Sequence, residues 1–382
     1  MKAPILHAGF DGLKFTVSAT IGPEFRQRLV EAKLKAIRSN SQVVLDLGPV
    51  ALSVRRSGGM AFSAHTGEYG AEWYFLDPQN LPPNNPGVTV DFRAFLLATG
   101  GINAAEEHFR ECMDAFGIHG SEGDVRVSRV DFAVDLLAPW FEPCGEALVV
   151  PPGTRKTEYT GVDETGTVSS GASVIGLRAG QIANRQLVIY DKRLEIMSQG
   201  KMGWLPIWNA ALAKAGLSPL CLDDPNTSRV WRFELRMGSR QLRNRWEMRS
   251  WQELRERVGD AYAEFCERIT YTQPTADSNR SRWPVHPLWE QVVEVVNSDL
   301  LEYRIGVLPD LVKTVNRDTH MEMLDRQILG LMVSRAAAAG IQAGTFEDFV
   351  QAHPAKLLAL SERHPRALRE RMVKAEGKYR FK

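Results

Sequence analysis

The segment that decides the fold reads Val127-Ser128-Arg129-Val130-Asp131-Phe132-Ala133-Val134-Asp135-Leu136. From Val130 onward apolar and charged residues largely alternate. In a β-strand the apolar side chains therefore point to one face, and Arg129, Asp131 and Asp135 point to the other. Such alternation is typical of a strand with one face on a hydrophobic core and one face in water. The segment predicts an antiparallel sheet with a charged, solvated face.

Two later segments, residues 187–192 and 230–236, repeat this pattern of an apolar and a reactive side. The reactive side chains that alternation places opposite the apolar ones are Tyr190, Lys192, Arg232, Glu234 and Arg236. If the three segments are neighbours in one sheet, a single face displays carboxylates, arginines, a tyrosine and a lysine. The alternative is an ordinary solvated face, whose charged side chains point outward only because water solvates them.

This mixture of side chains has a chemistry of its own. Carboxylate oxygens can hold a hard divalent cation. The cation and the arginines can neutralise a phosphate, and a tyrosine hydroxyl is a competent nucleophile toward phosphorus. A tyrosine is mostly protonated at neutral pH, so we expect Lys192 or Arg185 to favour its phenolate.

The predicted secondary structure of the rest of the chain changes near residue 250. The first part, residues 1–250, reads as short strands with a few helices, and residues 251–382 read almost wholly as helix, with a linker at 277–282. We therefore predict the α+β class, with an antiparallel sheet followed by an all-helical C-terminal region. The strands expected are 13–19, 43–47, 50–55, 60–63, 72–76, 88–92, 126–136, 186–191 and 229–237. The helices expected are 24–37, 104–116, 205–215, 252–269, 288–303 and 308–339, then a final basic helix.

Composition excludes several classes of protein. The chain has 382 residues, 44% of them hydrophobic, and a net charge of +1. No apolar run is long enough to cross a bilayer and no signal-peptide pattern begins the chain, so we expect a cytoplasmic protein without a membrane partner. Basic residues are concentrated locally, with nine arginines against four glutamates in residues 229–257. Such a segment suits a phosphate-binding surface or a solvated helix face.

Taken in order, three motifs carry a resemblance to a known family. They are Arg129-Val-Asp131-Phe-Ala-Val-Asp135, then Asn184-Arg185-Gln-Leu-Val-Ile-Tyr190-Asp191-Lys192-Arg-Leu-Glu195, then Arg232-Phe-Glu234-Leu-Arg236. This order and spacing resemble the plasmid and phage replication initiation factor family of the Rep_trans type, which contains rolling-circle initiators. The segment Phe10–Val17 is similar to the family's first strand. The resemblance implies a sheet of HUH-endonuclease-like or RRM-like character, without the paired-histidine motif.

The resemblance also implies residue roles. Tyr190 takes the role of nucleophile, with Lys192 and Arg185 beside it. Asp131 and Glu234 become the best candidates to hold Mg²⁺ or Mn²⁺, with Asp135 and Glu195 weaker ones. Tyr190 would displace a 3′-hydroxyl, giving a 5′-phosphotyrosyl enzyme and a free primer end. The arginines expected to contact DNA are Arg129, Arg232, Arg236, Arg240 and Arg243.

The partners implied are origin DNA, both duplex and single-stranded, and a second copy of the chain. No G-x-x-x-x-G-K-[ST] loop occurs, so a host helicase would supply the motor. We expect the helical region to bind origin duplex or to mediate self-association. The alternatives left open are a conjugative relaxase with the same chemistry and a catalytically silent DNA-binding regulator. An RRM-like RNA-binding module fits less well, because the strands lack an aromatic ladder.

Overall fold

The chain folds into a large antiparallel sheet with helices on both faces, which confirms the predicted α+β class. The computed structural model describes residues 2–58, 61–80, 85–119, 124–159, 175–298 and 328–363, together with 321, 325, 365, 369 and 372. The chain divides into two compact units, Met1–Val312 and Lys313–Lys382. Among the described residues, no helix combines the length and the apolarity needed to cross a membrane.

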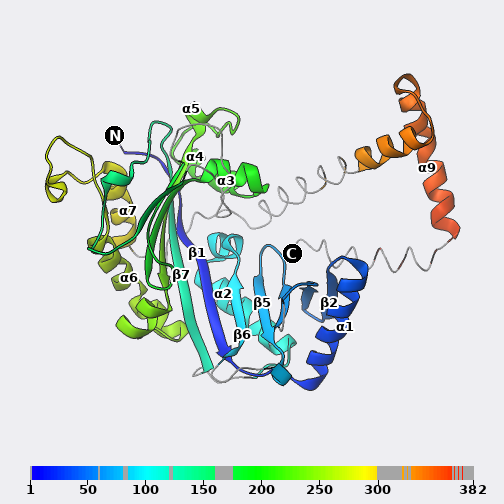
Figure 1. The fold of residues 1–382 in the computed structure, drawn as a ribbon, viewed down its shortest axis with the longest axis horizontal. Helices are drawn as coiled ribbons and strands as arrows, with labels where there is room; N and C mark the ends of the chain where they lie inside the picture. Colours follow the sequence, from blue (N-terminus) through cyan, green and yellow to red (C-terminus); the bar gives the residue numbers. More distant parts are fainter. Residues whose placement is uncertain are drawn as a thin grey trace. The chain divides into compact units, whose positions relative to one another are not determined.

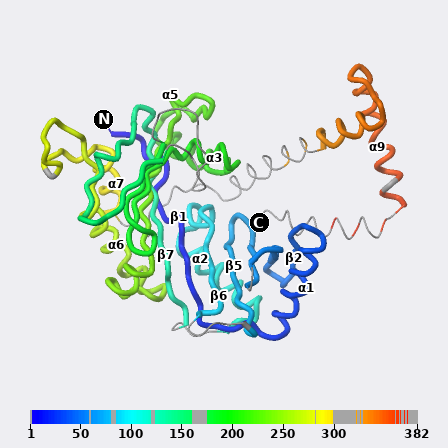
Figure 2. Tube along the Cα trace, in the orientation of Figure 1, coloured from blue at the N-terminus to red at the C-terminus, as the bar shows by residue number. Residues whose placement is uncertain are grey.

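The sheet of the first unit contains eleven strands in the order β2-β3-β4-β5-β6-β1-β7-β12-β11-β10-β9. Each neighbouring pair is antiparallel, and β1 runs beside β7 (Figure 2). The strands are β1 (Ile5–Ser18), β2 (Val43–Leu47), β3 (Val50–Val54), β4 (Ala61–His65), β5 (Ala71–Leu76), β6 (Gly87–Phe92), β7 (Val125–Leu137), β9 (Lys156–Tyr159), β10 (Gly176–Gly180), β11 (Arg185–Asp191) and β12 (Val230–Gly238). A second sheet pairs β8 (Leu148–Val149) with β13 (Thr270–Tyr271).

The three segments that suggested the fold are the central strands β7, β12 and β11, and they are neighbours. Their apolar side chains, such as Phe132 and Phe233, are fully buried in the main core. The helices that contribute to this core are α1 (Pro23–Ser39), α2 (Ala94–Ala115), α6 (Trp251–Arg268) and α7 (Pro287–Asn297) (Figure 1). The alternation read from the sequence therefore identified correctly the face that packs on the main core.

The opposite face of the sheet is covered as well, which corrects the expectation of a solvated face. The helices α3 (Lys192–Gln199) and α4 (Trp204–Lys214) contribute to a smaller second core on this side. The charged side chains of the central strands are enclosed there, with Arg232 and Asp135 at 0% exposure. A buried charge needs a partner, and Arg232 and Asp135 form an ion pair with 2.6 Å between Nε and Oδ1. The face is charged but not wet.

The boundary expected at residue 250 is also corrected, because α6 and α7 belong to the first unit. The Trp251 ring stacks on Phe15 of β1 with 4.1 Å between ring centroids. The Tyr262 hydroxyl donates to the carbonyl oxygen of Val130 at 3.0 Å, and Gln291 bonds the backbone of Ala3 at both its N–H and its C=O. An amphipathic helix is stabilised mainly by burying its apolar face, and here the sheet provides the surface.

Several local expectations also differ from the structure. Strand β1 begins at Ile5 and carries register shifts, whereas the sequence suggested a start at residue 13. The strands β9 and β10 and the helix α3 were not predicted. Helix α2 breaks at Gly101 (φ 67°), a backbone conformation that suits glycine, instead of being capped at Asn103. The predicted loop 161–171 lies outside the described residues, as does most of the helix expected at 308–339.

The second unit is helical where it is described. Its helix α9 (Phe346–Arg363) follows the turn Ala343–Thr345, and residues 328–338 form another helical stretch. Several large apolar side chains of this unit are exposed, among them Leu331 at 71%. The helical character expected for the C-terminal region is thus present in this unit, while β13 interrupts it within the first unit.

Candidate active site

Tyr190 lies in a row of side chains that crosses four neighbouring strands. Tyr190 of β11 pairs with Arg232 of β12, Arg232 pairs with Asp135 of β7, and Asp135 pairs with His7 of β1. Directly paired residues on adjacent strands point to the same face of a sheet. The row therefore brings a hydroxyl, a guanidinium, a carboxylate and an imidazole together from residues far apart in the sequence.

Lys192 lies against the Tyr190 hydroxyl because α3 begins directly after β11. Its Nζ donates to the Tyr190 hydroxyl oxygen at 3.4 Å and forms an ion pair with Glu195. Lys192 is buried at 3% exposure, and Tyr190 is half-buried. Burial, and then the nearby Glu234 charge, raise the pKa of Tyr190 well above its ordinary value. Burial, and then Arg232, lower the pKa of Lys192. A larger fraction of this amine is therefore neutral at a given pH and available to accept a proton, although it binds that proton less tightly than an ordinary lysine does.

Arg232 is held by two carboxylates at the centre of the row. Its guanidinium donates to both oxygens of Asp135, at 2.6 and 2.7 Å, and to Asp11 at 2.5 Å. The Trp204 ring lies 4.2 Å from the guanidinium carbon, and the Trp208 indole N–H donates to Asp135 at 2.9 Å. The arginine predicted to contact DNA is therefore fully enclosed and engaged inside the protein.

Three of the carboxylates predicted to hold a metal, Asp131, Glu234 and Asp135, are each bound by an arginine, and the fourth, Glu195, is bound by two lysines. Asp131 accepts from Arg129 at 3.0 Å. Glu234 accepts from Arg236 at 2.8 and 3.0 Å. Within the described part of the chain, no group of three or more His, Cys, Asp or Glu side chains is placed to hold an ion. A divalent cation would have to displace an arginine, so these residues do not fit a metal in this arrangement.

Asp131 and Glu234 nevertheless influence each other. Burial raises the pKa of Asp131 to about 7, and the Glu234 charge adds to this while Arg129 opposes it. Asp131 also lies close against β1, where a Cβ at Gly12 would be 2.6 Å from its Oδ2. The absence of a side chain at Gly12 is what leaves room for this buried carboxylate.

The remaining predicted residues lie elsewhere. Arg185 is on the opposite face from Tyr190, with its guanidinium 3.7 Å from Glu264 of α6, so the structure does not bring it to the site. Arg240 and Arg243 are exposed on the π-helix η4 (Arg240–Arg245), which follows β12. These two side chains are accessible for contact with a phosphate backbone.

Three residues of the site were missed by sequence reasoning: His7, Asp11 and Trp204. His7 is buried at 1% exposure, and neither ring nitrogen has a hydrogen-bond partner among the described residues. Burial lowers the pKa of His7 to about 4, although Asp135 opposes the shift. Asp11 lies in the Phe10–Val17 motif, but the register shift that carries it to this face has no sequence signal.

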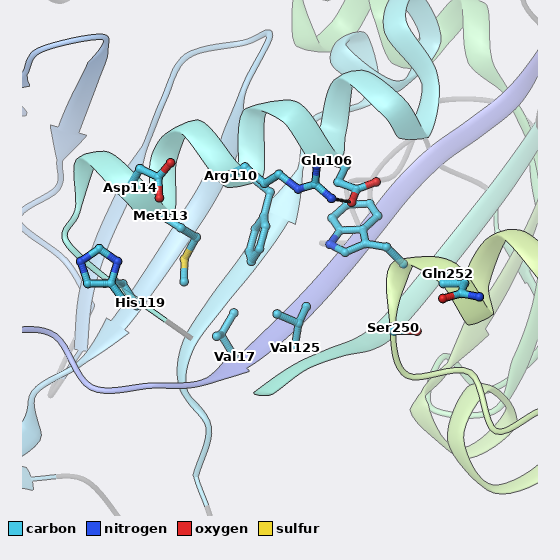
Figure 3. Close-up of a pocket in the computed structure, with 12 residues that line it drawn as sticks. Val17, Glu106, Arg110, Met113, Asp114, His119, Val125, Ser250 and Gln252 are labelled. Atoms are coloured by element: carbon cyan, nitrogen blue, oxygen red, sulfur yellow. Dashed lines mark hydrogen bonds and ion pairs between the residues drawn. The ribbon is translucent and has the colours of Figure 1, made fainter. Parts of the chain in front are cut away.

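A cavity of about 340 Å³ lies apart from this row (Figure 3). It opens between α2 and the start of α6, beside the end of β1 and the beginning of β7, and Val17, Glu106, Arg110 and Val125 are among its lining residues. Glu106 pairs there with Arg110. None of the predicted site residues lines this cavity.

Comparisons with known proteins add little to this geometry. No family model matches the chain, and no curated protein matches it. Among solved structures, the chain is similar to the rolling circle replication initiator protein from Geobacillus stearothermophilus. The two are 14% identical with a TM-score of 0.37, and the match covers 79% of this chain and 98% of that one. A likeness of this degree assigns no residue role.

Proposed function

We propose that the protein nicks one strand of DNA at a replication origin, with Tyr190 as the nucleophile. The observation that carries this proposal is the hydrogen bond from Lys192 to the Tyr190 hydroxyl, on a sheet face where Arg232 is paired with Tyr190 across the strands. A nucleophile, a base and a buried positive charge are the groups that phosphoryl transfer requires. The sequence resemblance to replication initiation factors points to the same residues.

The reaction is a transesterification. The Tyr190 oxygen forms a bond to phosphorus, and the bond from phosphorus to the 3′-oxygen breaks. This yields a 5′-phosphotyrosyl enzyme and a free 3′-hydroxyl. Because the pKa of Tyr190 is raised by burial, the hydroxyl needs a base at the moment of attack, and Lys192 is the nearest candidate. The bond energy is kept in the adduct, so rejoining needs no nucleotide.

Mg²⁺ or Mn²⁺ stays a prediction from the sequence. When bound, such an ion would neutralise phosphate charge. Asp131 and Glu234 are paired with arginines, and the buried guanidinium of Arg232 supplies positive charge without a metal ion. Chelation with EDTA tests the requirement, since a metal-dependent enzyme loses nicking and a metal-independent one keeps it.

DNA contact is proposed for the exposed arginines of η4. Arg240 and Arg243 are accessible, whereas Arg129, Arg232 and Arg236 bind carboxylates within the protein. Backbone contact by such side chains would position the duplex without reading its sequence. Single-stranded origin DNA, a second copy of the chain and a host helicase are further proposed partners.

Two other functions share this site. A conjugative relaxase would use the same chemistry, and the genes beside this one would distinguish it. A catalytically silent regulator would bind DNA without forming an adduct, and the arginine pairing of the carboxylates would suit such a protein.

The test is incubation of the protein with supercoiled plasmid carrying its origin, with Mg²⁺, with Mn²⁺ and with EDTA. We expect open circles and a covalent protein–DNA band after denaturation. Tyr190→Phe should abolish both, because a phenyl ring has no oxygen to attack phosphorus, while Tyr74→Phe on β5 serves as the matched control. Adduct formation by Tyr190→Phe would sink the assignment, and binding without nicking by the wild type would favour the regulator.

A further inference from the structure

Lys192 belongs to a short chain of charges that runs from Tyr190 to the protein surface. Its ammonium pairs with Glu195, and Glu195 in turn accepts from Lys201 at 2.8 Å. Lys192 and Glu195 are three residues apart in α3 and so share one helix face. The Asp191 side chain fixes this helix against β11 by accepting the Leu194 N–H at 3.0 Å.

The turn after α3 brings Lys201 back to Glu195. Gly200 adopts a left-handed conformation with φ 66°, which favours glycine. The Lys201 N–H then bonds the carbonyl oxygen of Ile196 at 2.9 Å. The backbone, and not only the side chain, therefore sets the position of Lys201.

Burial changes along this chain of charges. The side chains of Lys192 and Glu195 are 4% and 9% exposed, whereas that of Lys201 is 45% exposed. Enclosed ion pairs are costly unless every charge has a partner, and here one carboxylate serves two lysines. The other charged or titratable groups near Lys192 are Arg232 of β12, Asp11 and His7 of β1, and Tyr190 of β11.

We propose that Glu195 is a positioning residue, which holds the Lys192 amine against the Tyr190 hydroxyl and is itself held by Lys201. This inference rests on the proposed function of Tyr190. The neutral Lys192 amine takes the hydroxyl proton, and Glu195 stabilises the ammonium that forms. The phenolate bonds to phosphorus, the 3′-oxygen leaves, and the ammonium returns the proton to it. The amine is thereby regenerated and no co-reactant is consumed.

The experiment measures adduct formation against pH for the full chain, using supercoiled plasmid that carries the origin. Glu195→Gln keeps the shape of the side chain but removes its charge. We expect a roughly tenfold lower plateau rate, because the ammonium is less stabilised. We also expect the acidic limb to move down by about one pH unit, because Lys192 then loses its proton more readily. A purely structural role would lower the rate without moving the limb.

A second pair of variants shows whether Glu195 acts through Lys192. Once Lys192→Met is in place, Glu195→Gln should leave the remaining rate unchanged within about twofold. Lys201→Met should lower the plateau less than Glu195→Gln does, and the exposed Lys35→Met of α1 is its matched control. An unmoved pH profile, or an undiminished effect of Glu195→Gln in the Lys192→Met chain, would overturn the inference. Absence of any adduct from the wild type would instead overturn the proposed function.

Discussion

Arg232 shows what a single enclosed charge contributes to this fold. Its guanidinium has three hydrogen bonds to Asp135 and Asp11 and lies against the Trp204 ring. It is also the residue paired with Tyr190 across the sheet. Stability and the geometry of the candidate site therefore depend on the same side chain.

Replacing Arg232 with methionine should destabilise the protein by about 3–5 kcal/mol, because it leaves buried carboxylates without a partner. Urea denaturation measures this loss. Adding Asp135→Asn should restore part of the stability, since one uncompensated charge is then removed. The exposed Arg38→Met of α1 is the matched control, and a loss no larger than that of Arg38→Met would contradict the expected role.

Asp131 should make stability depend on pH. Its pKa is raised to about 7 in the folded chain from an ordinary 3.8, so the folded state binds the proton more tightly than the unfolded state does. The resulting stabilisation is present below pH 3.8 and is lost as the pH rises through 7. Asp131→Asn should remove about 2 kcal/mol of the loss between roughly pH 5 and pH 8.

Denaturation of wild type and Asp131→Asn at both pH values provides the measurement. Asp260→Asn, at an exposed position on α6, controls for the change of charge. If Asp131→Asn and wild type lose the same stability over this range, the carboxyl of Asp131 is ionised in the folded protein at the lower pH.

At the scale of elements, the alternation of apolar and charged residues identified the strands that form the centre of the sheet. The central strands β7, β11 and β12 follow a period of two and were located from the sequence, and their adjacency is confirmed. The short strand β10 contains two glycines among its five residues and has little alternation to detect. Helix α3 follows β11 with no turn between them, because Asp191 is the last residue of β11 and also the N-cap of the helix. Local sequence patterns therefore predicted the central strands, but they predicted neither β10 nor the junction between β11 and α3.

Strand alternation also decides how much of the candidate site could be predicted from the sequence. Alternation placed Tyr190 with Arg232 and Glu234 on one face. Nothing in the sequence reveals that each carboxylate has an arginine neighbour, because register and side-chain direction decide the pairing. Arg185 lies on the same strand as Tyr190 but an odd number of positions away, so its side chain points to the opposite face of the sheet.

The helix α6 is expected to be essential to the first unit. Ending the chain at Ser250 removes the rings of Trp251 and Tyr262, which pack on the apolar face of the sheet. We expect this shortened chain to bind a hydrophobic dye and to lose cooperative thermal unfolding. A chain ending at residue 312 keeps the whole first unit and should unfold cooperatively. Cooperative unfolding of the 1–250 chain would contradict the division between the two units.

At the scale of the whole molecule, we expect both units to contribute to the proposed DNA binding. The first unit contains the Tyr190 row and the exposed arginines of η4. The second unit, Lys313–Lys382, carries basic residues in its last part and exposed aliphatic side chains. DNA affinity is expected to depend on both.

The salt dependence of origin binding measures each contribution. Removing residues 313–382 should weaken binding and flatten the plot of log affinity against log salt, because fewer phosphates are neutralised. Arg240→Gln combined with Arg243→Gln should reduce the slope by about 2, if each arginine contacts one phosphate. An unchanged slope after removal of residues 313–382 would exclude that unit from DNA binding and leave self-association as its expected role.

The row of paired residues from His7 to Tyr190 determines when the candidate site can form during synthesis of the chain. His7 is translated early, Asp135 and Tyr190 follow, and Arg232 comes last of the four. Strand β12 is inserted between β7 and β11, so Tyr190 has no partner strand on that side until β12 has left the ribosome. Pairings between distant segments form slowly. A nascent chain stalled before β12 therefore contains Tyr190 but lacks the Arg232 that pairs with it, and we expect the proposed DNA cleavage to begin only when synthesis of the first unit is nearly complete.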